Sequence, residues 1–127
     1  MSIQARRVQK ANPQQPGGVR KYYLIPKSRG KMGIKEMSNH IGKRTTINVA
    51  DSVGTLNSLA ELVPEMAAEG WIIDLSPLGS FMVTLETEGE LNPKDLTAKN
   101  VKRFKLKFNP SQQVEDMLKN IKIEIID

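Results

Sequence analysis

The segment Val101–Pro110, VKRFKLKFNP, constrains the fold most, because charged and apolar residues alternate along it. Alternate residues of a β-strand face opposite sides of the sheet. One face would be apolar and would carry Phe104, Leu106 and Phe108. The other face would be cationic and would carry Arg103, Lys105 and Lys107, with Lys99 in the same phase upstream. The sequence therefore predicts a strand that covers a core with one face and presents cations about 7 Å apart on the other.

A row of cations at this spacing fits a polyanion. Phosphates repeat at about 3.4 Å of helix axis along each DNA strand, so such a row would meet roughly every second phosphate. Lys102 adds a further cation to the same segment. Nucleic acid is therefore a candidate partner.

Charge is sorted into blocks along the 127-residue chain, whose net charge is +5. Residues 1–30 hold seven Lys or Arg and no acid, and residues 51–90 hold eight acids and no Lys or Arg. Residues 91–107 then hold six bases and one acid. This arrangement favours one binding face for an anionic partner, and the alternative is an ordinary solvated surface.

The composition of 39% hydrophobic and 26% charged residues is that of a soluble globular protein large enough for one domain with a core of its own. The chain has no cysteine, which excludes disulfides and thiolate metal sites and fits a cytoplasmic protein. The basic N-terminus has no apolar stretch of a secretory signal, and no apolar run approaches the roughly 18 residues of a membrane span.

Residues 1–32 form a basic N-terminal region of short extended pieces around a Pro- and Gly-rich loop at Ala11–Gly18. Tyr22–Pro26 is expected to form a strand, and Ser28–Gly33 a linker. The cations Arg6, Arg7 and Lys10 in this region are candidate phosphate contacts.

Two helices are predicted next. Ile34, Met37 and Ile41 lie on one face of a short helix that ends near Gly42. Thr46 or Asn48 is expected to cap the N-terminus of the second helix. The second helix runs from about Ala50 to Glu69, and its apolar stripe consists of Val53, Leu56, Leu59, Val63 and Met66. The stripe either packs in the core or, with Phe81, forms the interface with a second chain.

The rest of the chain is predicted to be mainly β-structure. Trp71–Leu75 and Phe81–Leu85 are expected strands, and residues 86–96 form the loop or tip of a long hairpin that returns through the basic strand. A short helix is predicted after Asn109-Pro110-Ser111, and Ile123–Ile126 is expected to form a last strand.

Catalysis has little support in the sequence. His40 is the only histidine, and no nucleophile triad, HExxH or phosphate-binding Gly-rich motif is present. Glu86, Glu88 and Glu90 alternate, but a solvated acidic edge is the simpler interpretation of three carboxylates without a histidine. We therefore expect no enzyme activity, no cofactor and no metal.

DNA binding has more support. The predicted contacts are Lys94, Lys99, Lys102, Arg103, Lys105 and Lys107, with Arg6, Arg7 and Lys10. Asn92-Pro93 either makes a turn or places a Pro wedge between base pairs of the minor groove. Aromatic residues are few, which favours duplex DNA over a single strand.

The order of these elements resembles the HU and integration host factor family of bacterial histone-like proteins. Leu78-Gly79-Ser80-Phe81 is similar to the family's Phe-Gly-Thr-Phe, and Phe108-Asn109-Pro110-Ser111 to its Phe-Lys-Pro-Gly. The segments VQKANPQQP and KYYLIPKSRGK resemble the HU-like branch with an N-terminal extension. The HU-type core covers about residues 33–120, and with the extension the likeness covers nearly the whole chain.

The resemblance implies an intertwined homodimer whose two β-arms embrace the minor groove and bend duplex DNA with little sequence preference. It implies an arm at about Thr84–Arg103, with Pro93 as the candidate intercalating proline. The sequence departs from the family in four places: the acids Glu86, Glu88 and Glu90 of the arm, Pro77 in the turn, Gln112 and Glu115 in place of lysines, and Leu91-Asn92-Pro93 in place of the family's Arg-Asn-Pro.

The expected fold is α+β: two N-terminal helices, a three-stranded antiparallel sheet with a β-arm, a C-terminal helix and extra N-terminal strands, with residues 33–127 as the HU-like domain. The expected function is that of a non-enzymatic, nucleoid-associated DNA-binding protein. The alternative is a dimeric HU-fold module that binds another protein and little or no DNA. RNA binding is a third possibility.

Overall fold

A computed structural model describes residues 1–10, 14 and 17–126. The chain divides into two compact units, one of Met1–Met32 with Asp116–Asp127 and one of Gly33–Glu115. Most of the predicted loop at Ala11–Gly18 lies outside the described residues.

The first unit contains a three-stranded sheet of order β2-β1-β6. Strands β1 (Ser2–Lys10) and β2 (Lys21–Pro26) are antiparallel, and β6 (Lys122–Ile126) is parallel to β1. A parallel pair needs a long connection, and here the whole second unit separates the two strands in sequence. We expected the last strand within the HU-like region, but its backbone pairs with the N-terminal strand.

The second unit begins with helices α1 (Ile34–Arg44) and α2 (Val49–Ala68). The Gly33 amide donates to the Glu36 carboxylate at 3.0 Å, and the Asp51 amide donates to Asn48 Oδ1 at 2.8 Å. Asn48 therefore caps α2, and it is one of the two residues that the sequence predicted for this role. Such a cap satisfies an amide that has no partner inside the helix.

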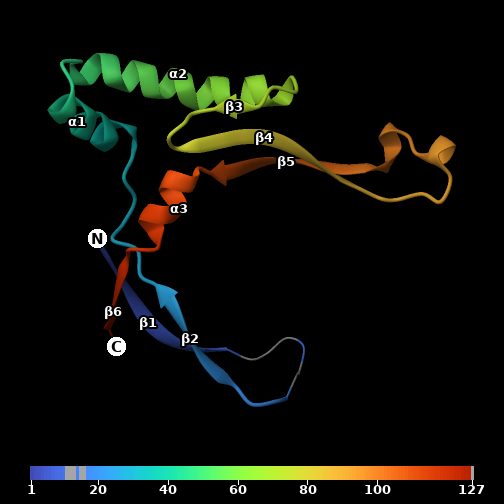
Figure 1. The fold of residues 1–127 in the computed structure, drawn as a ribbon, viewed down its shortest axis with the longest axis horizontal. Coiled ribbons are helices and arrows are strands. Elements are labelled where there is room, and N and C mark those ends of the chain that lie inside the picture. The colour runs from blue at the N-terminus through green and yellow to red at the C-terminus, as the bar shows by residue number, and fades with distance from the viewer. Residues whose placement is uncertain (11–13, 15–16, 127) are drawn as a thin grey trace. The chain divides into compact units, whose positions relative to one another are not determined.

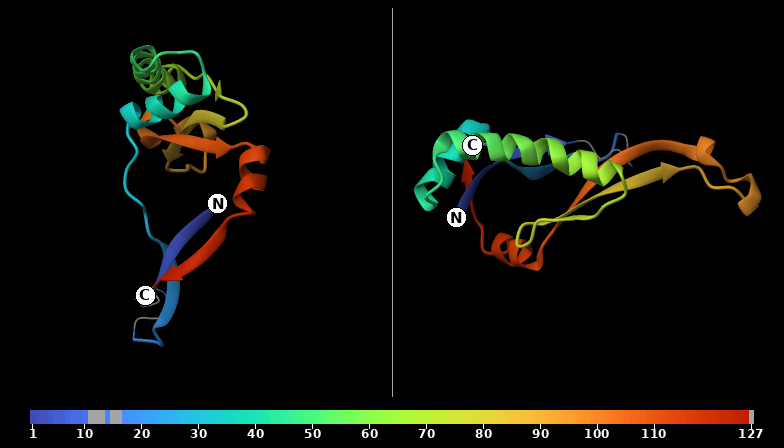
Figure 2. Two further views of the ribbon diagram at one scale, coloured as in Figure 1. Left: turned by 90° about the vertical axis from the view of Figure 1, so that its left-hand side faces the viewer. Right: turned by 90° about the horizontal axis from the view of Figure 1, so that it is seen from above.

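A three-stranded antiparallel sheet follows, made of β3 (Ile73–Asp74), β4 (Gly79–Thr87) and β5 (Val101–Pro110). Strands β4 and β5 form a two-stranded ribbon that extends past the end of α2 in both Figure 1 and Figure 2. Its tip holds two 3-10 turns, η1 (Pro93–Asp95) and η2 (Ala98–Asn100). Helix α3 (Gln112–Leu118) begins after β5. The predicted α+β class is confirmed.

Lys99 departs from the sequence prediction. It was expected to continue the cationic phase of the basic strand, but it lies in η2, outside β5, so that prediction is wrong. The reason is local: Thr97 Oγ1 accepts the Lys99 amide at 3.3 Å, and the Asn100 amide bonds to the Thr97 carbonyl at 3.0 Å. These bonds close a turn that an extended strand cannot make.

The chain buries little apolar surface on its own. Among the described residues only two apolar side chains are fully buried, Ala5 and Ala67. A chain of this length was expected to enclose a core. Instead, large apolar side chains stay exposed on helices, ribbon and N-terminal sheet alike.

Gly79 provides a test of the turn between β3 and β4. Its φ of +150° disfavours any side chain, and an added Cβ would lie 2.2 Å from the Asn109 carbonyl oxygen and 2.9 Å from Pro110 Cα. These two atoms belong to the backbone and cannot move aside, and the Phe108 ring also lies 2.9 Å away. We predict that Gly79→Ala lowers the free energy of unfolding by at least about 2 kcal/mol in urea denaturation.

Gly89→Ala is the matched control, because nothing lies within 4 Å of a Cβ at that position. Its unfolding midpoint should stay close to that of the wild type. Equal midpoints for the Gly79 and Gly89 variants would show that the turn tolerates a side chain.

Candidate functional site

The cationic face of β5 lies where the alternation predicts. In the register of the ribbon, Arg103 is opposite Glu86, Lys105 is opposite Thr84, and Lys107 is opposite Met82. Cross-strand partners share one face of a sheet. The ten residues of β5 span about 34 Å at 3.4 Å per residue, so the row of cations follows an extended edge.

Much of this positive charge is met by carboxylates of the same ribbon. Glu86 Oε2 lies 2.6 Å from Arg103 Nε and 3.2 Å from Lys105 Nζ. Glu88 Oε1 lies 3.4 Å from Lys102 Nζ. The acids at 86 and 88 are therefore direct ion-pair partners of the basic strand rather than a separate acidic edge.

Lys102 reaches Glu88 because the register of the ribbon shifts between Glu86 and Thr87. Thr87 is opposite Val101 and Glu86 is opposite Arg103, which leaves Lys102 as the extra residue on β5. An extra residue of this kind redirects a side chain relative to regular alternation.

All three ion pairs are exposed, with side chains 43% to 67% accessible. Exposed pairs contribute at most about 1 kcal/mol each, so an external anion can displace the carboxylates. Among the described residues, no carboxylate lies within ion-pair distance of the three other cations, which are Lys94, Lys99 and Lys107.

At the ribbon tip, Asn92 and Pro93 form a turn. Asn92 Oδ1 accepts the Lys94 amide at 3.1 Å, and Pro93 occupies the first turn of η1. The neighbouring Leu91 is the most exposed large apolar residue of the described chain, at 107% of its reference accessibility. Sequence reasoning noted Leu91 only as a departure from the family's Arg-Asn-Pro and did not include it among the predicted contacts.

Asn100 holds the two sides of this tip together and was also missed. Its Nδ2 donates to Glu90 Oε1 at 3.0 Å, and its Oδ1 accepts the Thr97 amide at 3.0 Å. Its carbonyl accepts the Glu88 amide at 2.9 Å. Only the full geometry of the loop reveals this role, because the contacts span up to twelve residues.

The apolar face of the ribbon is mostly uncovered. Phe81 and Phe108 are in contact, with ring centroids 4.9 Å apart, but Phe104 is 70% exposed and Leu106 is 49% exposed. Phe104 lines a hollow of about 240 Å³ between the end of α2 and the ribbon, together with Trp71 and Val83.

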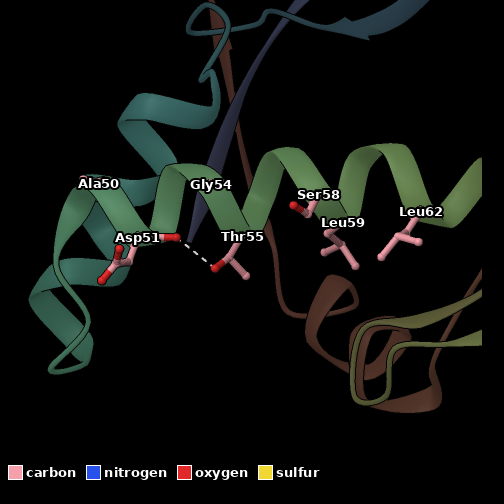
Figure 3. Close-up of a pocket in the computed structure, with 7 residues that line it drawn as sticks. All are labelled: Ala50, Asp51, Gly54, Thr55, Ser58, Leu59 and Leu62. Carbon is pink, nitrogen blue, oxygen red and sulfur yellow. Dashed lines mark hydrogen bonds between the residues drawn. The ribbon is translucent and has the colours of Figure 1, made fainter.

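The predicted interface stripe of α2 divides between two environments. Leu56 lines a small cavity with Ile41 and Ile47 of the same chain, whereas Leu59 is exposed. Figure 3 shows Leu59 on an open face of α2 with Ser58 and Leu62, in a groove of about 640 Å³. The remaining predicted interface residues are half-buried within the chain; they are Val53, Val63, Met66 and Phe81.

In the first unit, the alternation of side chains along β1 separates the three N-terminal candidates. Arg6 and Lys10 share one face of the sheet, and Arg7 lies on the opposite face with Ala5. All three of these cations are exposed.

The described residues contain no cluster of three or more potential metal ligands among His, Asp and Glu. His40 is an exposed residue of α1. Within the part of the chain that the structure describes, no helix is both long and apolar enough to cross a membrane.

The family of the chain follows from its sequence. Residues 1–124 match the family model described as "HU domain fused to wHTH, Ig, or Glycine-rich motif". The chain belongs to this HU family. The resemblance inferred from the Gly79 turn and from the segment around Asn109-Pro110 is thereby confirmed.

A solved structure has a similar fold. It is described as the "Crystal structure of a Putative bacterial DNA binding protein from Bacteroides vulgatus ATCC 8482", and it matches with a TM-score of 0.66 at 8% sequence identity. The match covers 98% of this chain but only 48% of the solved chain, so this HU-family chain spans about half the length of that protein. No curated protein matches the sequence.

Proposed function

We propose that this HU-family chain is a non-enzymatic, homodimeric protein that binds duplex DNA through phosphate contacts with low sequence specificity and bends it. The observation that carries the proposal is the cationic face of β5 on an extended two-stranded ribbon. The family match and the DNA-binding description of the structural neighbour support it.

Electrostatics favour phosphate contacts over base readout in this ribbon. Lys105 and Lys107 are flexible point charges on a strand, and such cations bind phosphate without reading sequence. Arg103 and Lys105 already converge on one anion, the Glu86 carboxylate. A DNA phosphate would take the place of this carboxylate and form ion pairs with the same two cations.

The uncovered apolar surface of the second unit supports the dimer. The groove beside Leu59 and Leu62 and the hollow beside Phe104 are both open in the single chain. Burying a leucine side chain stabilises a fold by about 1.5–3 kcal/mol. A second copy of the chain would supply the missing contacts, as the resemblance to HU implies.

A second candidate function is that of a dimeric module that binds a protein rather than DNA. The observation in its favour is the ion pairing of Glu86 and Glu88 with the basic strand, because it lowers the positive field of the ribbon. The two functions make opposite predictions for charge reversal on β5.

We predict that reversing two charges, Lys105→Glu with Lys107→Glu, lowers the affinity for a 30-base-pair duplex at least about tenfold. The physical reason is that two attractive contacts to phosphate become repulsive. Fluorescence anisotropy at fixed salt measures the change.

The matched control is Lys35→Glu with Lys43→Glu on α1, which changes the net charge equally but away from the ribbon. Its affinity should fall less than about threefold, because only long-range charge is altered. Equal losses for the two variants, or unchanged affinity in both, would contradict a site on β5, and a wild-type chain that binds no duplex would favour the protein-binding module.

The ribbon tip is predicted to bend the bound duplex. Apolar wedges between base pairs kink DNA by about 20–90°, and Leu91 and Pro93 are the exposed apolar candidates at the tip. Leu91→Ser with Pro93→Ala should therefore straighten the bound duplex, as measured by energy transfer between dyes at its two ends.

The half-exposed Leu96 of the same tip is the control for this experiment. Leu96→Ser should leave the bend of the bound duplex unchanged. A bend that persists in the Leu91 and Pro93 variant would show that the tip does not kink DNA.

The dimer is predicted to depend on the open groove of α2. Leu59→Glu with Leu62→Glu places two charges among apolar contacts and should give a species with the mass of one chain in sedimentation velocity. Asn57→Glu adds a charge on α2 outside the groove lining and should leave the dimer intact. A wild-type chain that sediments as a monomer at low micromolar concentration would contradict the proposal.

A further inference from the structure

The N-terminal sheet has two faces of different chemistry. The face that holds Ala5 also carries apolar residues of all three strands, namely Ile3, Leu24, Pro26, Ile123 and Ile125. All of them except Ile125 line an apolar groove of about 250 Å³ within the first unit. Such a face serves packing, which leaves the opposite face for solvent or a ligand.

The opposite face combines cations with the apolar or aromatic residues Val8, Tyr23, Ile25 and Ile126. The register brings four exposed cations from all three strands to this face, and they are Arg6, Lys10, Lys21 and Lys122. One acid shares the face, Glu124, which is opposite Gln4. Charges of one sign gathered from separate strands create a positive field over the sheet.

Two features distinguish this face from the ribbon. Among the described residues, no carboxylate lies within ion-pair distance of the four cations, whereas Glu86 and Glu88 occupy much of the basic strand. In addition, Lys10 and Lys21 are direct cross-strand partners. Like charges directly opposite one another destabilise a sheet unless an anion lies between them.

We propose that this cationic face is a second contact surface for the phosphate backbone of duplex DNA. The proposal rests on the proposed function, in that DNA is the ligand, and it adds Lys21 and Lys122 to the contacts while excluding Arg7. Measured along the direction of β1, the positions of Lys122, Arg6 and Lys10 are spaced about 13 Å apart. This spacing matches roughly every fourth phosphate of one DNA strand.

Duplex DNA is favoured over a single strand by the aromatic content of this face. Tyr23 is the one aromatic side chain on it, since Tyr22 lies on the apolar face. A surface that binds single strands stacks successive bases on several aromatic rings. The cationic face instead offers separated charges, which match a regular backbone.

The test uses the full chain and a 30-base-pair duplex over a salt series. Lys21→Gln with Lys122→Gln should make the slope of log K against log salt shallower by about 0.9 for each lysine that contacts phosphate. Lys35→Gln with Lys43→Gln removes the same charge from exposed positions of α1, outside the sheet strands, and should leave the slope unchanged.

Lys21→Arg with Lys122→Arg keeps the charge and should retain the wild-type slope, which separates loss of contact from loss of folding. Equal slopes for the glutamine variant and its control would overturn the proposal, even where the Lys105 and Lys107 variant shows that the ribbon binds DNA. A slope change confined to single-stranded DNA would overturn the assignment to duplex. A wild-type chain that binds no DNA would overturn the proposed function as well.

Discussion

Leu59 and Leu62 on α2 and Phe104 and Leu106 on β5 present apolar side chains that one chain leaves exposed. Marginal stability is the rule even for proteins with a closed core, and here only Ala5 and Ala67 are buried apolar residues among those described. The helices and the ribbon therefore need a further surface to pack against. Under the proposed function a second copy of the chain would supply that surface, and the ribbon would project from the dimer.

Charge is used differently in the two units. On the ribbon, Glu86 and Glu88 hold the basic side chains in ion pairs, which moderates their attraction for an anion. On the N-terminal sheet, Lys10 and Lys21 are opposite one another without such a partner among the described residues. Binding at the ribbon would thus exchange a carboxylate for a phosphate, whereas the sheet offers cations directly. Under the proposed function, both surfaces would contribute positive charge to the binding of DNA.

Local patterns in the sequence predicted the local structure well. The alternation of Val101–Pro110 predicted β5 with its bounds, and Asn48 was among the expected caps of α2. Features that depend on distant residues were not predictable. The gathering of Arg6, Lys21 and Lys122 on one face depends on the register of three strands that are far apart in sequence. The parallel pairing of β6 with β1 joins the two ends of the chain, which no local pattern reveals.

The affinity of the wild-type chain for duplex DNA over a salt series tests the central claim most directly. Each neutralised phosphate contributes about −0.9 to the slope of log K against log salt. The two cationic surfaces predict strong binding at about 50 mM salt and a slope steeper than about −4, equivalent to five or more phosphate contacts for a dimer. Absence of binding at this low salt, or an affinity that does not change with salt, would contradict the account.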